Sequence, residues 1–100
     1  MLTVNFMNWN CYLKFGQYAN GRTAIQLFDT ADHEPVCTAT VNVPEVELPE
    51  GYVFIKNYSE NEGILETLVA AGIIDPPTIM KGIGQVMVHG CKLNVDPEDA

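Results

Sequence analysis

The sequence predicts an α+β fold, in which an antiparallel sheet of about five to seven strands, curved towards a barrel, carries one packed helix. Two observations predict it: the first half alternates apolar and polar residues around an Asn-Gly turn signal, and the second half contains one segment with helical spacing. The chain has 100 residues, 47% apolar and 18% charged, which suits one folded core. We expect residues 1–95 to form a single domain and residues 96–100 to be a polar tail.

Strands account for the first part of the chain, over residues 2–9, 11–19 and 22–29. Asn20-Gly21 lies between the last two. Both residues tolerate the positive φ angles of a type I′ turn, which makes the predicted hairpin loop two residues long. Such a loop predicts the cross-strand pairs Ala19–Arg22, Tyr18–Thr23, Gly16–Ile25, Leu13–Phe28 and Tyr12–Asp29.

In this register both faces of the hairpin are apolar. One face carries Cys11, Leu13, Phe15, Ala24 and Phe28, and the other carries Tyr12, Tyr18, Ile25 and Leu27. A single helix covers only part of one face, and a large exposed apolar face is unusual in a monomer. Either the sheet curls into a partial barrel that covers itself, or a second copy or another partner covers it. The sequence leaves both open.

Residues 36–43 alternate apolar and polar side chains, as a half-buried strand does. Pro44 and Pro49 then bracket an acidic loop, because proline lacks the amide donor that strand pairing needs. That loop contains Glu45, Glu47 and Glu50. The strands predicted beyond it cover residues 52–56, 78–80 and 84–93.

The one convincing helix is predicted to begin at Ser59, whose hydroxyl forms a capping box with the Glu62 carboxylate. Apolar residues then recur at helical spacing over about twelve residues. Gly72 supplies the left-handed residue that ends a helix, and Ile73 and Ile74 follow it as apolar contacts. The segment Asp75-Pro76-Pro77 prevents the helix from continuing.

Charge is distributed unevenly along the chain. The formal net charge is −8, and ten acidic residues but one basic residue, Lys56, lie between Thr23 and Met80. Because carboxylates repel phosphates, direct nucleic-acid binding is not expected. No apolar run approaches the length of a membrane span, and the first residues lack a signal-peptide pattern, so we expect a cytoplasmic protein that does not enter membranes.

The residues suited to catalysis or metal binding form no recognisable set. The only serine is Ser59, which the predicted cap occupies. His89 and Cys91 share a strand face, but with Cβ atoms about 6 to 7 Å apart, too far for direct activation. Three widely spaced cysteines argue against a disulfide framework or a zinc knuckle. The cluster Asp29, Asp32, His33 and Glu34 could hold a hard cation, although a solvated acidic turn is its ordinary interpretation. We therefore expect no metal or cofactor and a protein that is not an enzyme, with an enzyme of unknown class as the second alternative to the binding functions described next.

The charge pattern favours a small binding protein that contacts a basic surface of another protein, with carboxylates guiding the encounter and tyrosines adding affinity. The residues expected to make this contact are Asp29, Asp32, Glu34, Glu45, Glu47, Glu50, Tyr52, Tyr58, Glu60, Glu62 and Glu66. The alternative is a binder of a small ligand or nucleotide signal, with a pocket at an oligomer interface. That pocket would be lined by Asn5, Asn8, Trp9, Asn10 and Arg22.

Two segments carry a resemblance to known sequences: VNFMNWNCYLKFGQYANGRTAIQL near the start and VFIKNYSENEGILETLVAAGI before and through the predicted helix. They resemble a family of short uncharacterised proteins encoded by gut bacteria, their phages and conjugative elements. The resemblance includes no catalytic motif and implies no activity. It implies a genetic setting in which small proteins act on host machinery or defence, which favours the binding interpretation.

Overall fold

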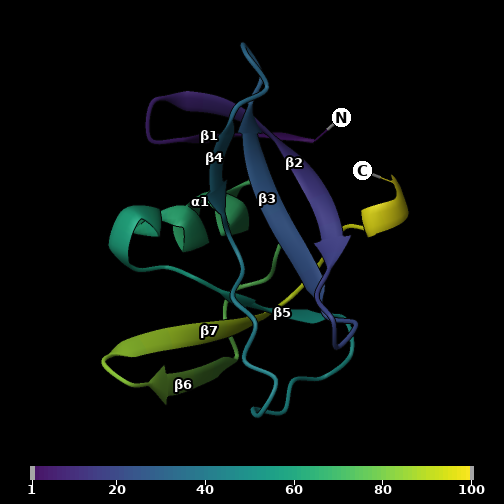
Figure 1. The fold of residues 1–100 in the computed structure, drawn as a ribbon, viewed down its shortest axis with the longest axis vertical. Coiled ribbons are helices and arrows are strands. Elements are labelled where there is room, and N and C mark those ends of the chain that lie inside the picture. The colour runs from purple at the N-terminus through teal and green to yellow at the C-terminus, as the bar shows by residue number, and fades with distance from the viewer. Residues whose placement is uncertain (1, 100) are drawn as a thin grey trace.

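Alternating apolar residues build two antiparallel sheets in the computed structural model, which describes residues 2–99 (Figure 1). The strands are β1 (Thr3–Phe6), β2 (Trp9–Gln17), β3 (Thr23–Asp29), β4 (Pro35–Thr38), β5 (Tyr52–Ile55), β6 (Ile79–Ile83) and β7 (Val86–Lys92). The helices are α1 (Ile64–Ala70) and the short 3-10 helices η1 (Ser59–Asn61) and η2 (Pro97–Asp99). The α+β class is confirmed, but the strands form two sheets, ordered β1-β2-β3-β4 and β5-β7-β6, and the described residues close no barrel.

The β2–β3 hairpin turns at the predicted place with a different register. The Gly21 amide donates to the Tyr18 carbonyl (2.9 Å), and the Tyr18 amide donates to the Arg22 carbonyl (2.8 Å), so the loop contains residues 19–21. Within it only Gly21 has a positive φ, +87°. These are the features of a type I turn followed by a left-handed glycine. The predicted type I′ turn and its cross-strand pairs were wrong.

The observed register decides which side chains are buried. Leu13 pairs with Leu27 and Phe15 pairs with Ile25, which gathers these four apolar residues on the face that becomes buried. Shifting the register by one residue would turn one strand over and split them between two faces. Burial therefore favours the three-residue loop. The prediction that Ile25 and Leu27 lie on the face opposite Leu13 was also wrong, and the outer face instead carries the half-buried Tyr12 and Phe28.

A second hairpin interrupts the strand predicted over residues 2–9. Phe6 pairs with Trp9 around the two-residue loop Met7-Asn8, in which Met7 has a φ of +56°. Val4 and Phe6 point into the core, as the alternation predicts. The loop contains neither glycine nor proline, so the sequence carries no ordinary turn signal at this point.

The strand predicted over residues 36–43 leaves the first sheet early and crosses to the second. β4 ends at Thr38, and beyond it a single bridge joins Thr40 to Ile55. Thr40 is buried, and its Oγ1 accepts a hydrogen bond from the Ile25 amide (3.2 Å) and shares one with the Tyr18 hydroxyl (2.8 Å). These two hydrogen bonds satisfy the buried hydroxyl of Thr40, in the segment that passes from the first sheet to the second.

The helix begins five residues later than predicted. Ser59 has a φ of +56° and lies at the start of η1 with no side-chain cap bond, so the predicted capping box was wrong. The acceptor comes instead from Asn57, whose Oδ1 accepts from the amides of Gly63 and Leu65, both at 3.0 Å. A side chain outside the helix thus satisfies two of its unpaired donors.

The end of α1 is as predicted. Gly72 has a φ of +75°, its amide donates to the Val69 carbonyl (3.0 Å), and the Ile73 amide donates to the Leu68 carbonyl (3.0 Å). This is a Schellman motif. Ile73 and Ile74 follow as buried contacts, so the helix spans seven residues and packs Ile64, Leu65 and Leu68 into the core.

The main core lies between the first sheet, α1 and one face of the second sheet. Its buried residues come from all three, and include Phe6, Leu13, Ile25, Ile55, Leu68 and Cys91. A smaller cluster of Val43, Phe54 and Val88 forms on the other face of the second sheet, beneath the loop that follows the crossing. The β6–β7 hairpin extends from this sheet at the lower left of Figure 1.

Replacing Asn57 by alanine removes both cap bonds of α1, so we expect a cost of about 1 to 2 kcal/mol in the free energy of unfolding. Asn57→Asp keeps the acceptor and should stay near wild type. Ser59→Ala should shift stability by less than about 0.5 kcal/mol. Thermal unfolding monitored by circular dichroism measures all three, and a larger loss for Ser59→Ala than for Asn57→Ala would contradict this assignment.

Candidate binding surface

The acidic segments of the chain do not gather in one place. Figure 1 shows the β3–β4 turn at the top of the long axis and the loop of residues 44–50 at the bottom, and the molecule is 37 Å long in its largest dimension. The start of α1 lies between them at one side. The expected contact zone that would unite all eleven residues is therefore not formed, and each segment has to be considered separately.

The β3–β4 turn is held by a dense set of hydrogen bonds. The Asp29 carbonyl accepts from the His33 amide (2.8 Å), and the Asp29 amide donates to the Glu34 carbonyl (2.8 Å). The carboxylates of Asp29 and Asp32 also accept from the amides of Ala31 (2.9 Å) and Glu34 (3.0 Å). The turn is thus fixed before any partner arrives, which reduces the entropy that binding would cost.

The β1–β2 hairpin lies beside this turn. The Thr30 amide donates to the Asn10 carbonyl (3.0 Å), and the Asn10 amide group donates to Thr30 Oγ1 (3.2 Å). Near this junction two large apolar side chains face solvent, Met7 at 60% and Trp9 at 44% exposure. We call this region the hairpin-turn surface. It comprises Met7, Asn8, Trp9, Asn10, Asp29, Asp32 and Glu34.

Aromatic contacts on the outer face of the first sheet support the turn. The ring of Tyr12 stacks on Phe28, with centroids 5.6 Å apart, and meets the edge of the His33 ring. The Tyr12 hydroxyl and His33 Nδ1 share a hydrogen bond of 3.1 Å. His33 therefore anchors the turn to the sheet, a role that its place in the acidic cluster did not indicate.

The residues of the alternative ligand site are separated. Arg22 lies at the far end of the β2–β3 hairpin from Trp9, and β2, whose nine residues begin at Trp9, spans about 30 Å. The Arg22 guanidinium donates to the carbonyls of Val43 (2.8 Å) and Val46 (2.6 Å) and lies over the Phe54 ring. It fastens the acidic loop to the hairpin, so those two donors are already engaged.

The same end of the molecule holds four more predicted contact residues. Glu45, Glu47 and Glu50 are exposed, and Tyr52 is half-buried. A hollow beside Arg22 is lined by residues 20–23 and 48–52, and none of Asn5, Asn8, Trp9 and Asn10 takes part in it. The asparagine-rich hairpin and the arginine thus form no common pocket within one molecule.

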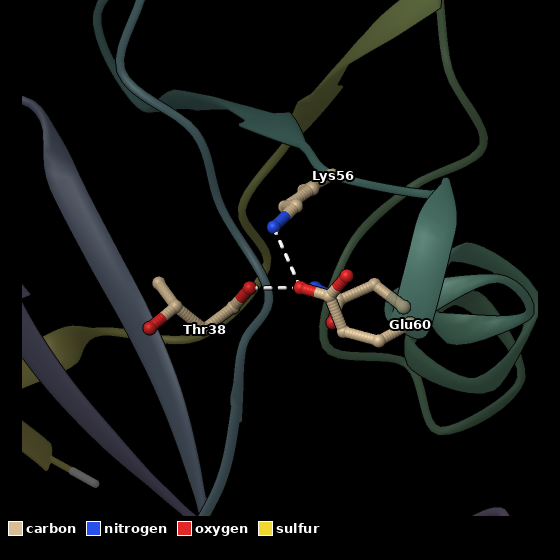
Figure 2. Close-up of polar contacts among 4 residues, drawn as sticks. Thr38, Lys56 and Glu60 are labelled. Atoms are coloured by element: carbon tan, nitrogen blue, oxygen red, sulfur yellow. Dashed lines mark hydrogen bonds and ion pairs between the residues drawn. The ribbon is translucent and has the colours of Figure 1, made fainter. Parts of the chain in front are cut away.

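Before the start of α1, the carboxylate of Glu60, one of the predicted contact residues, is paired with Lys56. Figure 2 shows Lys56 reaching Glu60, with Nζ and Oε1 2.7 Å apart, beside the carbonyl of Thr38. The hydrogen bond and charge of Lys56 hold the pKa of Glu60 below its ordinary value. The next residue, Asn61, is buried and donates to the Thr38 carbonyl (2.6 Å), which ties η1 to the crossing strand. This region is organised as a structural junction.

The remaining helix-side residues are dispersed. Glu62 and Glu66 are exposed, and Glu66 faces β1 across a hollow that it shares with Asn5. Tyr58 is half-buried and packs against the smaller core cluster. Its ring is thus partly used by the fold, and the helix side offers fewer free contact groups than the hairpin-turn surface.

All three thiols are held in the protonated state. Burial raises the pKa of Cys37 to about 11, with Cys11 and Glu60 adding to the rise. Burial and the charge of Asp75 raise the pKa of Cys91 to about 11. Burial also raises the pKa of Cys11. Since the thiolate is the nucleophile, none of these cysteines is activated in this structure.

Residues 2–99 contain no group of three or more His, Cys, Asp or Glu side chains that could hold a metal ion. No described helix has the length and apolar character that crossing a membrane requires. Sequence reasoning included Trp9 in the ligand set but missed Met7, because a methionine is ordinarily a core residue and only the hairpin loop exposes this one.

Compared with known proteins, the chain matches no protein-family model, no curated protein and no solved structure. The resemblance to short proteins of gut bacteria and their mobile elements therefore stays a prediction.

Replacing Arg22 by methionine keeps an apolar stem over Phe54 but removes both hydrogen bonds to the loop. We expect a loss of about 2 kcal/mol in the free energy of unfolding and faster proteolysis within residues 44–50. Lys14→Met is the matched control, since it removes the same charge from an exposed position. Equal melting temperatures and equal cleavage rates for the two variants would reject the anchoring role.

Native-state alkylation tests the thiols. A rise of the pKa from 9.0 to about 11 lowers the thiolate fraction of Cys37 about a hundred-fold at mildly alkaline pH, so iodoacetamide labelling should slow in proportion. Mass spectrometry of the labelled peptides gives the rate, and the same chain in denaturant is the reference. Labelling of Cys37 at the same rate in both states would show that the thiol is not protected.

Proposed function

We propose that this protein is a small non-enzymatic binding protein whose hairpin-turn surface contacts a basic surface of another protein. The observation that carries the proposal is the joining of an acidic turn to an exposed Trp-Met hairpin by the bonds between Asn10 and Thr30. The partner class that fits is a host protein that binds nucleic acid, because such proteins present basic surfaces. The resemblance to short proteins of mobile elements adds host defence proteins as a second source of partners.

The charges of this surface are available to a partner. The one ion pair among residues 2–99 joins Lys56 and Glu60, so Asp29, Asp32 and Glu34 carry charge that no basic side chain neutralises. Carboxylates that meet a basic surface raise the rate of encounter and orient the partner. The same carboxylates repel the phosphates of nucleic acid. The acidic turn therefore supports recognition of a cationic protein surface.

Exposed apolar side chains on the same surface can supply binding energy, which complementary charge alone supplies only weakly. Trp9 is 44% exposed and Met7 is 60% exposed, and tryptophan is among the residues that most often dominate binding energy at interfaces. A polar rim around an aromatic anchor is the ordinary arrangement of an interface. The hairpin-turn surface combines both, whereas the loop of residues 44–50 offers exposed carboxylates without an exposed aromatic ring.

The proposal predicts capture of a basic partner that is released by salt and depends on one end of the molecule. Immobilised protein is incubated with host lysate at low and high salt, and bound proteins are identified by mass spectrometry. Trp9→Ala should weaken capture at both salt concentrations, while the double variant Asp32→Asn/Glu34→Gln should weaken it mainly at low salt, where screening is least.

The matched control is Glu45→Gln/Glu47→Gln, which removes the same number of charges from the opposite end. Its capture should equal that of the wild type. Recovery of no basic protein, or equal losses in the two double variants, would rule out the hairpin-turn surface as the binding site. Circular dichroism of each variant confirms that the fold is retained.

A further inference from the structure

The β6–β7 hairpin brings three metal-ligating side chains to one face. Met80 is directly opposite His89, and Met87 precedes His89 by two residues on β7. Residues that are opposite across a ladder, or two apart on a strand, point to the same side. Two thioether sulfurs and an imidazole therefore share one face of the hairpin.

The spacing suits a single ion. Directly opposed residues have Cβ atoms about 4.5 to 5.5 Å apart and diagonal neighbours about 7 to 8 Å apart, while residues two apart on a strand lie about 6 to 7 Å apart. Methionine has three rotatable bonds in its side chain, so both sulfurs can converge on a point in front of the imidazole.

The two methionines face solvent, and His89 is half-buried with one ring nitrogen unsatisfied. Met80 is 67% exposed and Met87 is 46% exposed, so solvent reaches both thioethers. His89 Nδ1 is buried and has no hydrogen-bond partner among the described residues. A buried polar atom without a partner is uncommon in folded proteins, and an ion or water ordinarily accounts for one.

We propose that Met80, Met87 and His89 form a binding site for a soft monovalent metal ion, Cu(I). Thioether ligands select Cu(I) over harder ions, and imidazole is compatible with it. Zn(II) fits poorly, because its protein sites use thiolate, imidazole and carboxylate ligands. The site lies on the second sheet and is independent of the proposed protein contact.

Cys91 follows His89 by two residues on the same face of β7. It is fully buried, and its Sγ lies 4.0 Å from the His89 carbonyl oxygen. Cys37 is the one thiol with partial exposure, so it is the main competitor for added Cu(I) and has to be removed from the measurement.

The test is an anaerobic titration of Cu(I) into the full chain carrying Cys37→Ala, in competition with the chromogenic chelator bicinchoninate. One equivalent of Cu(I) should be withdrawn from the chelator. Met80→Leu and Met87→Leu preserve side-chain volume and should each weaken binding at least tenfold, as should His89→Gln. Met7→Leu, an exposed methionine on the other hairpin, should leave affinity unchanged.

A second readout locates the ion directly. Ag(I), a redox-inert substitute, should shift the methyl carbon signals of Met80 and Met87 and leave that of Met7 in place, and Zn(II) should shift none of them. Withdrawal of no Cu(I), unchanged affinity in the Met80→Leu/Met87→Leu double variant, or loss of binding with Cys91→Ala but not with the methionine variants would overturn the proposal.

Discussion

The register of the β2–β3 hairpin is the constraint on which the rest of this structure depends. By pairing Leu13 with Leu27 and Phe15 with Ile25, it places these four residues on the face that meets α1 and the second sheet. The opposite face keeps Tyr12, Lys14 and Gln26, which are half-buried or exposed. Because a strand has a period of two, no intermediate arrangement exists between this distribution and one with two apolar faces.

The same register positions the proposed contact surface. It ends β3 at Asp29 opposite Cys11, so the acidic turn emerges beside Asn10 and the β1–β2 loop. At the other end, it directs Arg22 to the carbonyls of Val43 and Val46, and Tyr18 to the buried hydroxyl of Thr40. These polar contacts hold in place the segment that passes from the first sheet to the second. One end of the hairpin thus lies beside the proposed contact surface, and the other end is held by contacts within the fold.

Local signals predicted the elements that local contacts determine. Gly72 ends α1 because the motif is completed within a few residues, and the turn at Asn20-Gly21 forms in place. Ser59 failed as a cap because Asn57, placed by the end of β5, supplies the acceptor instead. The loop at Met7-Asn8 was not predicted because it contains neither glycine nor proline. The grouping of Met80 with His89 depends on a pairing between strands, which no spacing along the chain reveals.

Inter-strand nuclear Overhauser effects measure the register of β2 and β3 most directly. This account predicts backbone contacts between Leu13 and Leu27 and between Phe15 and Ile25, with Tyr18 opposite Arg22. Contacts between Leu13 and Phe28 and between Gly16 and Ile25 would contradict it, since they would turn Ile25 and Leu27 away from the core and move Asp29 out of its place beside Asn10.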